Sequence, residues 1–156
     1  MLSLSKKADY ALLALSYIAS HGDRPVNARE ISAFFEIPAE LLAKILQRLA
    51  KAELLTSAPG PTGGYKLARA AERISVGQAI NAVEGQTAIT HCLKTEHNEC
   101  DQRGKCTIRT PLERINDRLI QMLGEISIAE MSSEDQQLIP HPSYILKASQ
   151  IPVQVL

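Results

Sequence analysis

Apolar residues recur at three- and four-residue spacing along the first half of the chain, which is the pattern of amphipathic helices. The first such stretch runs from Lys7 to His21. Its apolar positions share one face: Ala8, Leu12, Leu15, Ile18 and Ala19. A second helix is expected from Asn27 to about Phe35, where Asn27 suits the N-cap and Glu30, three residues later, completes a capping box.

A third helix is predicted after a tight turn at Glu36 and Ile37. Pro38 suits its first turn, because the fixed φ of proline matches a helix and its missing N–H is not needed there. The apolar positions of this helix are Leu42, Ile45, Leu46 and Leu49, and the polar positions are Glu40, Lys44, Gln47, Arg48 and Lys51. Two short helices joined by a tight turn, behind a supporting helix, predict a helix-turn-helix.

Two short strands are expected next, at 54–56 and 65–67, on either side of the Pro/Gly-rich segment 58–64. They predict a β-hairpin, or wing. A winged helix-turn-helix places its third helix in the major groove, with donors such as Lys44 and Gln47 near base edges. The alternative is a winged helix used for contacts with proteins.

A fourth helix is predicted from Ser75, with Gln78 at the capping-box position, to about Gly85. A polar loop, 86–109, follows. A long helix then starts at Thr110 and Pro111, with an apolar stripe formed by Leu112, Ile115, Leu119, Met122 and Ile126. This near-heptad spacing favours pairing with the same helix of a second copy, although the stripe could instead pack on the chain's own core.

The predicted fold class is mostly α: a winged helix-turn-helix with a two-stranded wing and a long C-terminal dimerisation helix. Three regions are expected: a DNA-binding region at 1–70, the cysteine loop and dimerisation helices at 71–133, and a polar tail at 134–156. The chain has 156 residues, 45% of them hydrophobic and 22% charged, which is enough to fold around one core.

The net charge of zero hides an uneven distribution. Residues 1–70 carry 9 Lys and Arg against 6 Asp and Glu, and residues 71–156 carry 8 against 11. A basic first half is compatible with binding to phosphates. The sequence has neither a signal-peptide pattern nor an apolar run that could span a bilayer, so a cytoplasmic protein without a membrane partner is expected.

Three cysteines lie within one short segment: Cys92, Cys100 and Cys106, separated by seven and then five residues. An odd number of cysteines is a poor disulfide framework, and the gaps are wider than those of zinc knuckles. Thiolates suit zinc or an iron–sulfur cluster, and a thiol switch is a further possibility. The sequence contains no recognisable motif of an enzyme active site.

Residues 1 to about 133 resemble the winged-helix iron–sulfur transcription regulators that include IscR, NsrR and RirA, and look most like the regulators of SUF cluster assembly. The resemblance is carried by Leu4-Ser5-Lys6, Asp9-Tyr10-Ala11, Gly60, Gly63-Gly64-Tyr65, Leu67-Ala68, Ile74-Ser75-Val76, Ala82-Val83-Glu84-Gly85, the three cysteines, Arg114-Ile115-Asn116 and Ile126-Ser127-Ile128-Ala129-Glu130-Met131.

The resemblance implies a homodimeric repressor that binds a pseudo-palindromic double-stranded operator and senses a [2Fe-2S] or [4Fe-4S] cluster. Its expected targets are genes for cluster assembly, iron handling or nitrosative and oxidative stress. The predicted DNA-contacting residues are Lys6, Arg29, Glu40, Ala43, Lys44, Gln47, Arg48, Gly63, Gly64 and Tyr65. The alternatives are a zinc- or thiol-based winged-helix protein without a cluster and a ferredoxin-like redox component.

The chain departs from the family pattern at two positions. Pro59 replaces a wing arginine usual in the family, and Arg109 replaces a histidine that is a ligand in IscR-type members. Arginine has no free lone pair for a metal, so a different fourth ligand is required. Asp9 lies where NsrR-type members place an aspartate that reaches the partner subunit's cluster, although an aspartate there also stabilises a helix N-terminus. The local rivals are His91, Glu96, His97 and Glu99.

Overall fold

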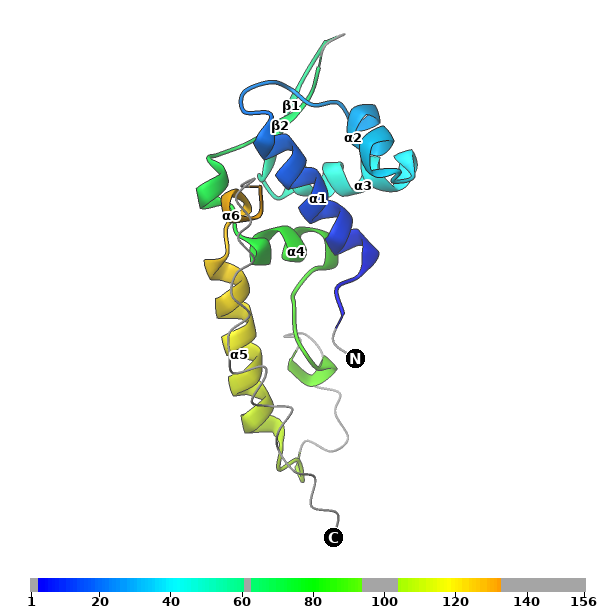
Figure 1. The fold of residues 1–156 in the computed structure, drawn as a ribbon. Helices are drawn as coiled ribbons and strands as arrows, with labels where there is room; N and C mark the ends of the chain where they lie inside the picture. The colour runs from blue at the N-terminus through cyan, green and yellow to red at the C-terminus, as the bar shows by residue number, and fades with distance from the viewer. Residues whose placement is uncertain (1–2, 61–62, 94–103, 133–156) are drawn as a thin grey trace, which may run out of the picture.

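The computed structural model describes residues 3–60, 63–93 and 104–132, and it confirms a mostly helical fold with a two-stranded antiparallel wing (Figure 1). Its elements are α1 Lys6–Ser20, α2 Ala28–Phe35, α3 Ala39–Lys51, β1 Leu55–Ala58, β2 Gly64–Leu67, η1 Ala71–Arg73, α4 Val76–Glu84, η2 His91–Leu93, α5 Arg109–Glu125 and α6 Ile128–Ser132. The elements predicted from the sequence are therefore present, and their ends differ from the expected ones by at most two residues.

Side-chain caps begin the first two helices. The Ser5 hydroxyl accepts from the Ala8 amide at 3.3 Å, and the Asn27 side chain accepts from the Glu30 amide at 2.8 Å. These bonds satisfy N–H groups that have no partner within the helix. The N-cap role predicted for Asn27 is therefore confirmed.

The second bond expected in the capping box at α2, from the Asn27 amide to the Glu30 carboxylate, is a wrong prediction. The Glu30 carboxylate faces α1 and the loop that follows α1 instead. Glu30 accepts from the Arg24 guanidinium at 2.6 and 3.1 Å and from the Tyr17 hydroxyl at 3.2 Å. The bond from Arg24 is the main cause that lowers the pKa of Glu30 below its ordinary value. Glu30 therefore ties α1 to α2. A complete capping box does form at α4, between Ser75 and Gln78 as predicted.

The turn between α2 and α3 depends on one left-handed residue. Glu36 has φ 54° and ends α2, and Pro38 is the N-cap of α3. The predicted apolar face of α3 is confirmed as buried: Leu42, Ile45, Leu46 and Leu49 are at most 2% exposed. Burying this face fixes which side of α3 is left for solvent.

The wing is attached to the loop before α2 as well as to α3. Leu55 pairs with Leu67 and Ala58 with Gly64, and the backbones of Val26 and Tyr65 exchange two hydrogen bonds, of 2.8 and 3.0 Å. A Cβ on Gly64 would lie 2.4 Å from the Val26 oxygen. The close approach therefore requires glycine at that position.

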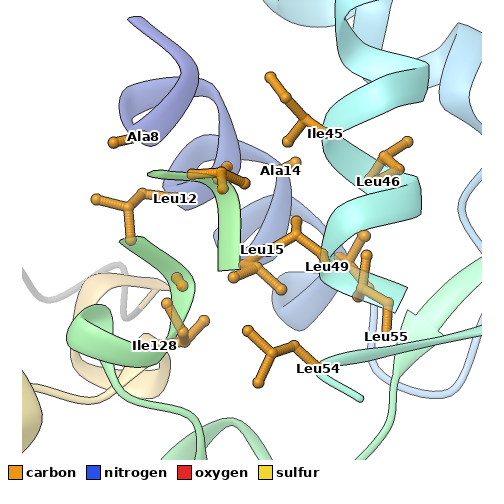
Figure 2. Packing of buried hydrophobic residues seen from close by; sticks show 14 of the residues in the cluster. Ala8, Leu12, Ala14, Leu15, Ile45, Leu46, Leu49, Leu54, Leu55 and Ile128 are labelled. Carbon is orange, nitrogen blue, oxygen red and sulfur yellow. The ribbon is translucent and has the colours of Figure 1, made fainter. Parts of the chain in front are cut away.

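One apolar core joins the winged helix to α4 and α6. Leu15 of α1 lies between Leu49 of α3 and Ile128 of α6, as Figure 2 shows, and Ile128 is fully buried. The same cluster includes Ile80 and Val83 of α4. Residues on both sides of position 70 thus share one core.

The long helix α5 extends away from this core (Figure 1). Its C-terminal end is anchored by backbone bonds on either side of Ser75: the Val76 amide donates to the Ile126 oxygen at 2.9 Å, and the Ile128 amide donates to the Ile74 oxygen at 2.8 Å. The tail predicted at 134–156 lies outside the described residues. Within the described ranges, no helix is long and apolar enough to cross a membrane.

Candidate DNA-binding surface and thiol site

The outer face of α3 carries the polar side chains expected of a recognition helix. Glu40, Lys44, Gln47 and Lys51 are exposed, and Ala43 is half-buried. All five lie on the side opposite the buried leucines and isoleucine, because their spacing of three or four residues repeats the helical turn. This face can reach an approaching duplex without disturbing the core.

Arg48 is exposed as predicted, but its guanidinium is directed to another helix. Its Nη1 donates to the carbonyl oxygen of Val83, in the last turn of α4. Arg48 thus lies at the edge of the outer face of α3, along the cleft that separates α3 from α4. Its contact with DNA remains a prediction, and the structure gives it a different partner.

The other predicted DNA contacts surround α3. Lys6 and Arg29 are exposed at the first turns of α1 and α2, where helix N-termini favour phosphate. The remaining ones, Gly63, Gly64 and Tyr65, belong to the returning arm of the wing and are half-buried. A Cβ on Gly63 would lie 2.2 Å from the Ala58 oxygen, so the hairpin itself requires this glycine. Pro59 is exposed beside Gly60, whose φ of 112° favours glycine.

Two of the three cysteines are described: Cys92 lies in η2, and Cys106 lies three residues before Arg109, the first residue of α5. Cys92 and Cys106 are half-buried free thiols. Arg109 donates from Nε to Glu113 at 2.8 Å, and this hydrogen bond is the main cause that raises the pKa of Arg109. Attraction by Cys92 and Cys106 also raises it.

The chain leading to Cys92 is fixed by two asparagines that the sequence interpretation overlooked. Asn81 of α4 accepts from the amide and the hydroxyl of Thr87, at 3.1 and 2.7 Å. Asn116, the one residue of α5 that is buried in the described structure, accepts from the Ile89 amide at 3.1 Å. The Thr90 hydroxyl then lies 3.3 Å from Cys92 Sγ. The sequence did contain one signal for this role: Asn116 is a polar residue among the apolar positions of the predicted helix.

The donor chemistry of this segment fits a group bound by thiolates. Soft sulfur ligands favour a thiophilic metal or an iron–sulfur cluster. Cys100 and the rival ligands Glu96, His97 and Glu99 lie outside the described residues, as does the side chain of His91. Within the described ranges, Asp9, Cys92 and Cys106 of one chain do not form a metal-binding group. Asp9 is exposed in the first turn of α1, accessible to a second chain.

The outer side of α5 carries a row of exposed apolar residues with seven-residue spacing. Ile108, Ile115 and Met122 are 60, 53 and 44% exposed. Leu112 and Leu119 of the predicted stripe are half-buried, and Ile126 packs against the core of its own chain. Ile126 therefore joins the core of its own chain, whereas Ile115 and Met122 are exposed, and their pairing with a second copy stays a prediction.

A two-stranded wing beside a recognition helix with a polar outer face defines the winged-helix class of DNA-binding proteins. The family model described as Rrf2, iron-dependent transcriptional regulator, matches residues 4–134, and the chain belongs to this family. It is therefore a transcriptional regulator and not an enzyme, and the family resemblance noted from the sequence is confirmed.

Individual relatives support the same assignment. The HTH-type transcriptional regulator IscR of Sodalis glossinidius is 34% identical over 136 residues, covering 86% of this chain and 81% of the relative. The HTH-type transcriptional regulator NsrR of Oceanobacillus iheyensis is 27% identical over 139 residues, covering 88% and 95%.

Solved structures share the fold. T. potens IscR has a TM-score of 0.69 at 25% identity and covers 93% of this chain and 96% of its own. CymR, the global cysteine regulator of B. subtilis, has a TM-score of 0.68 at 23% identity and covers 85% and 97%. The likeness to CymR is one of fold.

The first prediction concerns the outer face of α3. Lys44→Ala should weaken duplex binding and, if Lys44 contacts phosphate, reduce the salt slope by about one unit for every sequence. Gln47→Ala, if Gln47 reads a base edge, should cost ~1–3 kcal/mol at one operator position. Fluorescence anisotropy at several salt concentrations measures both. Arg114→Ala removes an exposed charge from α5 and serves as the control. If Lys44→Ala and Gln47→Ala both kept the wild-type duplex affinity and salt dependence, the DNA interface would not lie on this face of α3.

Proposed function

We propose that this chain is a repressor whose affinity for operator DNA is set by an iron–sulfur cluster held on Cys92, Cys100 and Cys106. The observation that carries the proposal is that Cys92 and Cys106 are half-buried free thiols on the chain that leads from the winged-helix core to the start of α5. The family's description as iron-dependent supports iron as the metal. When bound, the cluster would supply reversible reactivity toward oxidants, nitric oxide or iron loss.

The residues of the chain have distinct tasks in this proposal. The thiolates bind, and Asn81 and Asn116 orient the segment that carries Cys92. The outer face of α3 reads the operator, and the wing contacts the backbone beside it. The protein acts in the cytoplasm on cluster-assembly genes of the SUF type, or on genes for iron handling or nitrosative and oxidative stress.

The proposed function is tested by operator affinity in two states of one protein. A duplex selected from random-sequence DNA is titrated with anaerobically purified protein and with the same protein stripped by an iron chelator. The two affinities should differ by roughly 5- to 150-fold, the usual range of coupling between two sites. Cys106→Ala should show the stripped affinity before and after chelation. Equal affinities of the two wild-type forms would refute control by a metal group.

Asp9 of the partner subunit is the proposed fourth ligand. Its exposure and its position in the first turn of α1 leave the carboxylate accessible to a second chain. A hard carboxylate beside soft thiolates makes an exchangeable bond, which suits a sensor. Asp9→Ala should therefore shorten the lifetime of the visible chromophore in air. Asp23→Ala removes an exposed carboxylate from the loop after α1, outside the thiol site, and is the control. A wild-type lifetime for Asp9→Ala would exclude this ligand.

The homodimer is proposed to form through the exposed row on α5. Association would remove Ile108, Ile115 and Met122 from water, and this burial is the favourable contribution expected. Ile115→Glu should disrupt the dimer by burying an unpaired carboxylate, without opening the core of the monomer. Gln121→Glu places the same group on another exposed side of α5 and should leave the dimer intact. Sedimentation velocity gives the mass, and a dimeric, folded Ile115→Glu protein would contradict the interface.

A further inference from the structure

The last turn of α4 is held by two other helices. Arg48 of α3 donates to the Val83 carbonyl, and the Ser5 hydroxyl donates to the Glu84 carboxylate. Ser5 also caps α1, so one hydroxyl joins the start of α1 to the end of α4. The Val83 side chain is 2% exposed. The last turn of α4 is thus attached to α3 through the Val83 carbonyl and to the start of α1 through the Glu84 carboxylate.

The contact between Arg48 and the Val83 carbonyl is favourable because it lies at the end of a helix. The last carbonyls of an α-helix have no partner within the helix, and a cation near them is stabilised by the helix dipole. Arg48 supplies both the donor and the charge. Gly85, with φ 78°, ends α4 immediately after the contacted residues. A change in the path of the chain after Gly85 therefore acts first on the turn that Arg48 contacts.

The same turn leads to the first thiol along a series of bonded residues. Thr87 is bound to Asn81 in α4, Ile89 to Asn116 in α5, and the Thr90 hydroxyl contacts Cys92 Sγ. These contacts fix the path of the chain between α4 and Cys92. A contiguous series of hydrogen bonds and packed side chains of this kind can carry coupling between distant sites.

We propose that Arg48 is a positioning residue, which transmits the state of the cysteine segment from the last turn of α4 to the recognition helix α3. This inference rests on the proposed function, since it concerns how the state of the thiols reaches DNA. Lys44 and Gln47 contact the duplex, whereas Arg48 sets the position of α3 relative to α4. Loss of Arg48 should therefore change the response to the bound metal group more than it changes binding itself.

The test compares chelator-stripped and anaerobically purified forms of four proteins: wild type, Arg48→Ala, Arg48→Met and Lys51→Ala. Methionine keeps an apolar stem in place of the aliphatic part of arginine. Lys51 lines the same cleft and lies in the last turn of α3, on the face proposed to meet DNA, so its removal controls for the lost charge: it should lower the affinity of both forms equally and leave their ratio unchanged. Anisotropy with the selected duplex gives the ratio of the two affinities. Hydrogen exchange of the stripped proteins gives the protection of the Gly85 and Thr87 amides.

The expected result is a ratio within about twofold of one for both Arg48 variants and a wild-type ratio for Lys51→Ala, against roughly 5- to 150-fold in wild type. Exchange at Gly85 and Thr87 should be faster in the Arg48 variants alone. Two results overturn the inference while the proposed function stands: an equal loss of affinity in both forms with the ratio retained, or unchanged exchange at Gly85 and Thr87. A ratio of one in the wild-type protein refutes the proposed function, and with it the role proposed for Arg48.

Discussion

The burial of α1 is the constraint on which the rest of the structure depends. Ala8, Ala11 and Ala14 have no exposed surface, and such small side chains let neighbouring helices approach closely. The helix packs against α3, α4, α6 and β2. The recognition helix, the wing and the anchor of α5 are thus positioned from one element, and a change in the packing of α1 would move them all.

Much of this arrangement follows from residue patterns that act locally. The buried face of α3 and the Ser75–Gln78 capping box depend on residues three or four positions apart, so periodicity and capping rules predict them. The contacts that periodicity cannot predict are long-range. Glu30 fits a capping box by spacing, yet its carboxylate binds Arg24 and Tyr17 because the folded chain brings a guanidinium to it.

The candidate site likewise combines features that the sequence predicts with contacts that only the folded chain reveals. Thiol chemistry and spacing identify the cysteine segment, but they do not show that Asn81 and Asn116 hold the chain that leads to Cys92. Arg48 is exposed on the recognition helix, so its sequence position favours DNA contact, and only the packing of α4 reveals Val83 as its partner. A position on a helix face follows from periodicity, whereas the partner of a long side chain follows from tertiary structure.

The function proposed for this winged-helix regulator depends on an iron–sulfur cluster held by its thiols. The most direct measurement is the visible absorption spectrum of anaerobically purified protein, with iron and acid-labile sulfide determined per chain. A bound cluster predicts iron and sulfide together with iron–sulfur charge-transfer bands, all lost in Cys92→Ala and in Cys106→Ala. A colourless wild-type protein that contains zinc, or no metal, would contradict it.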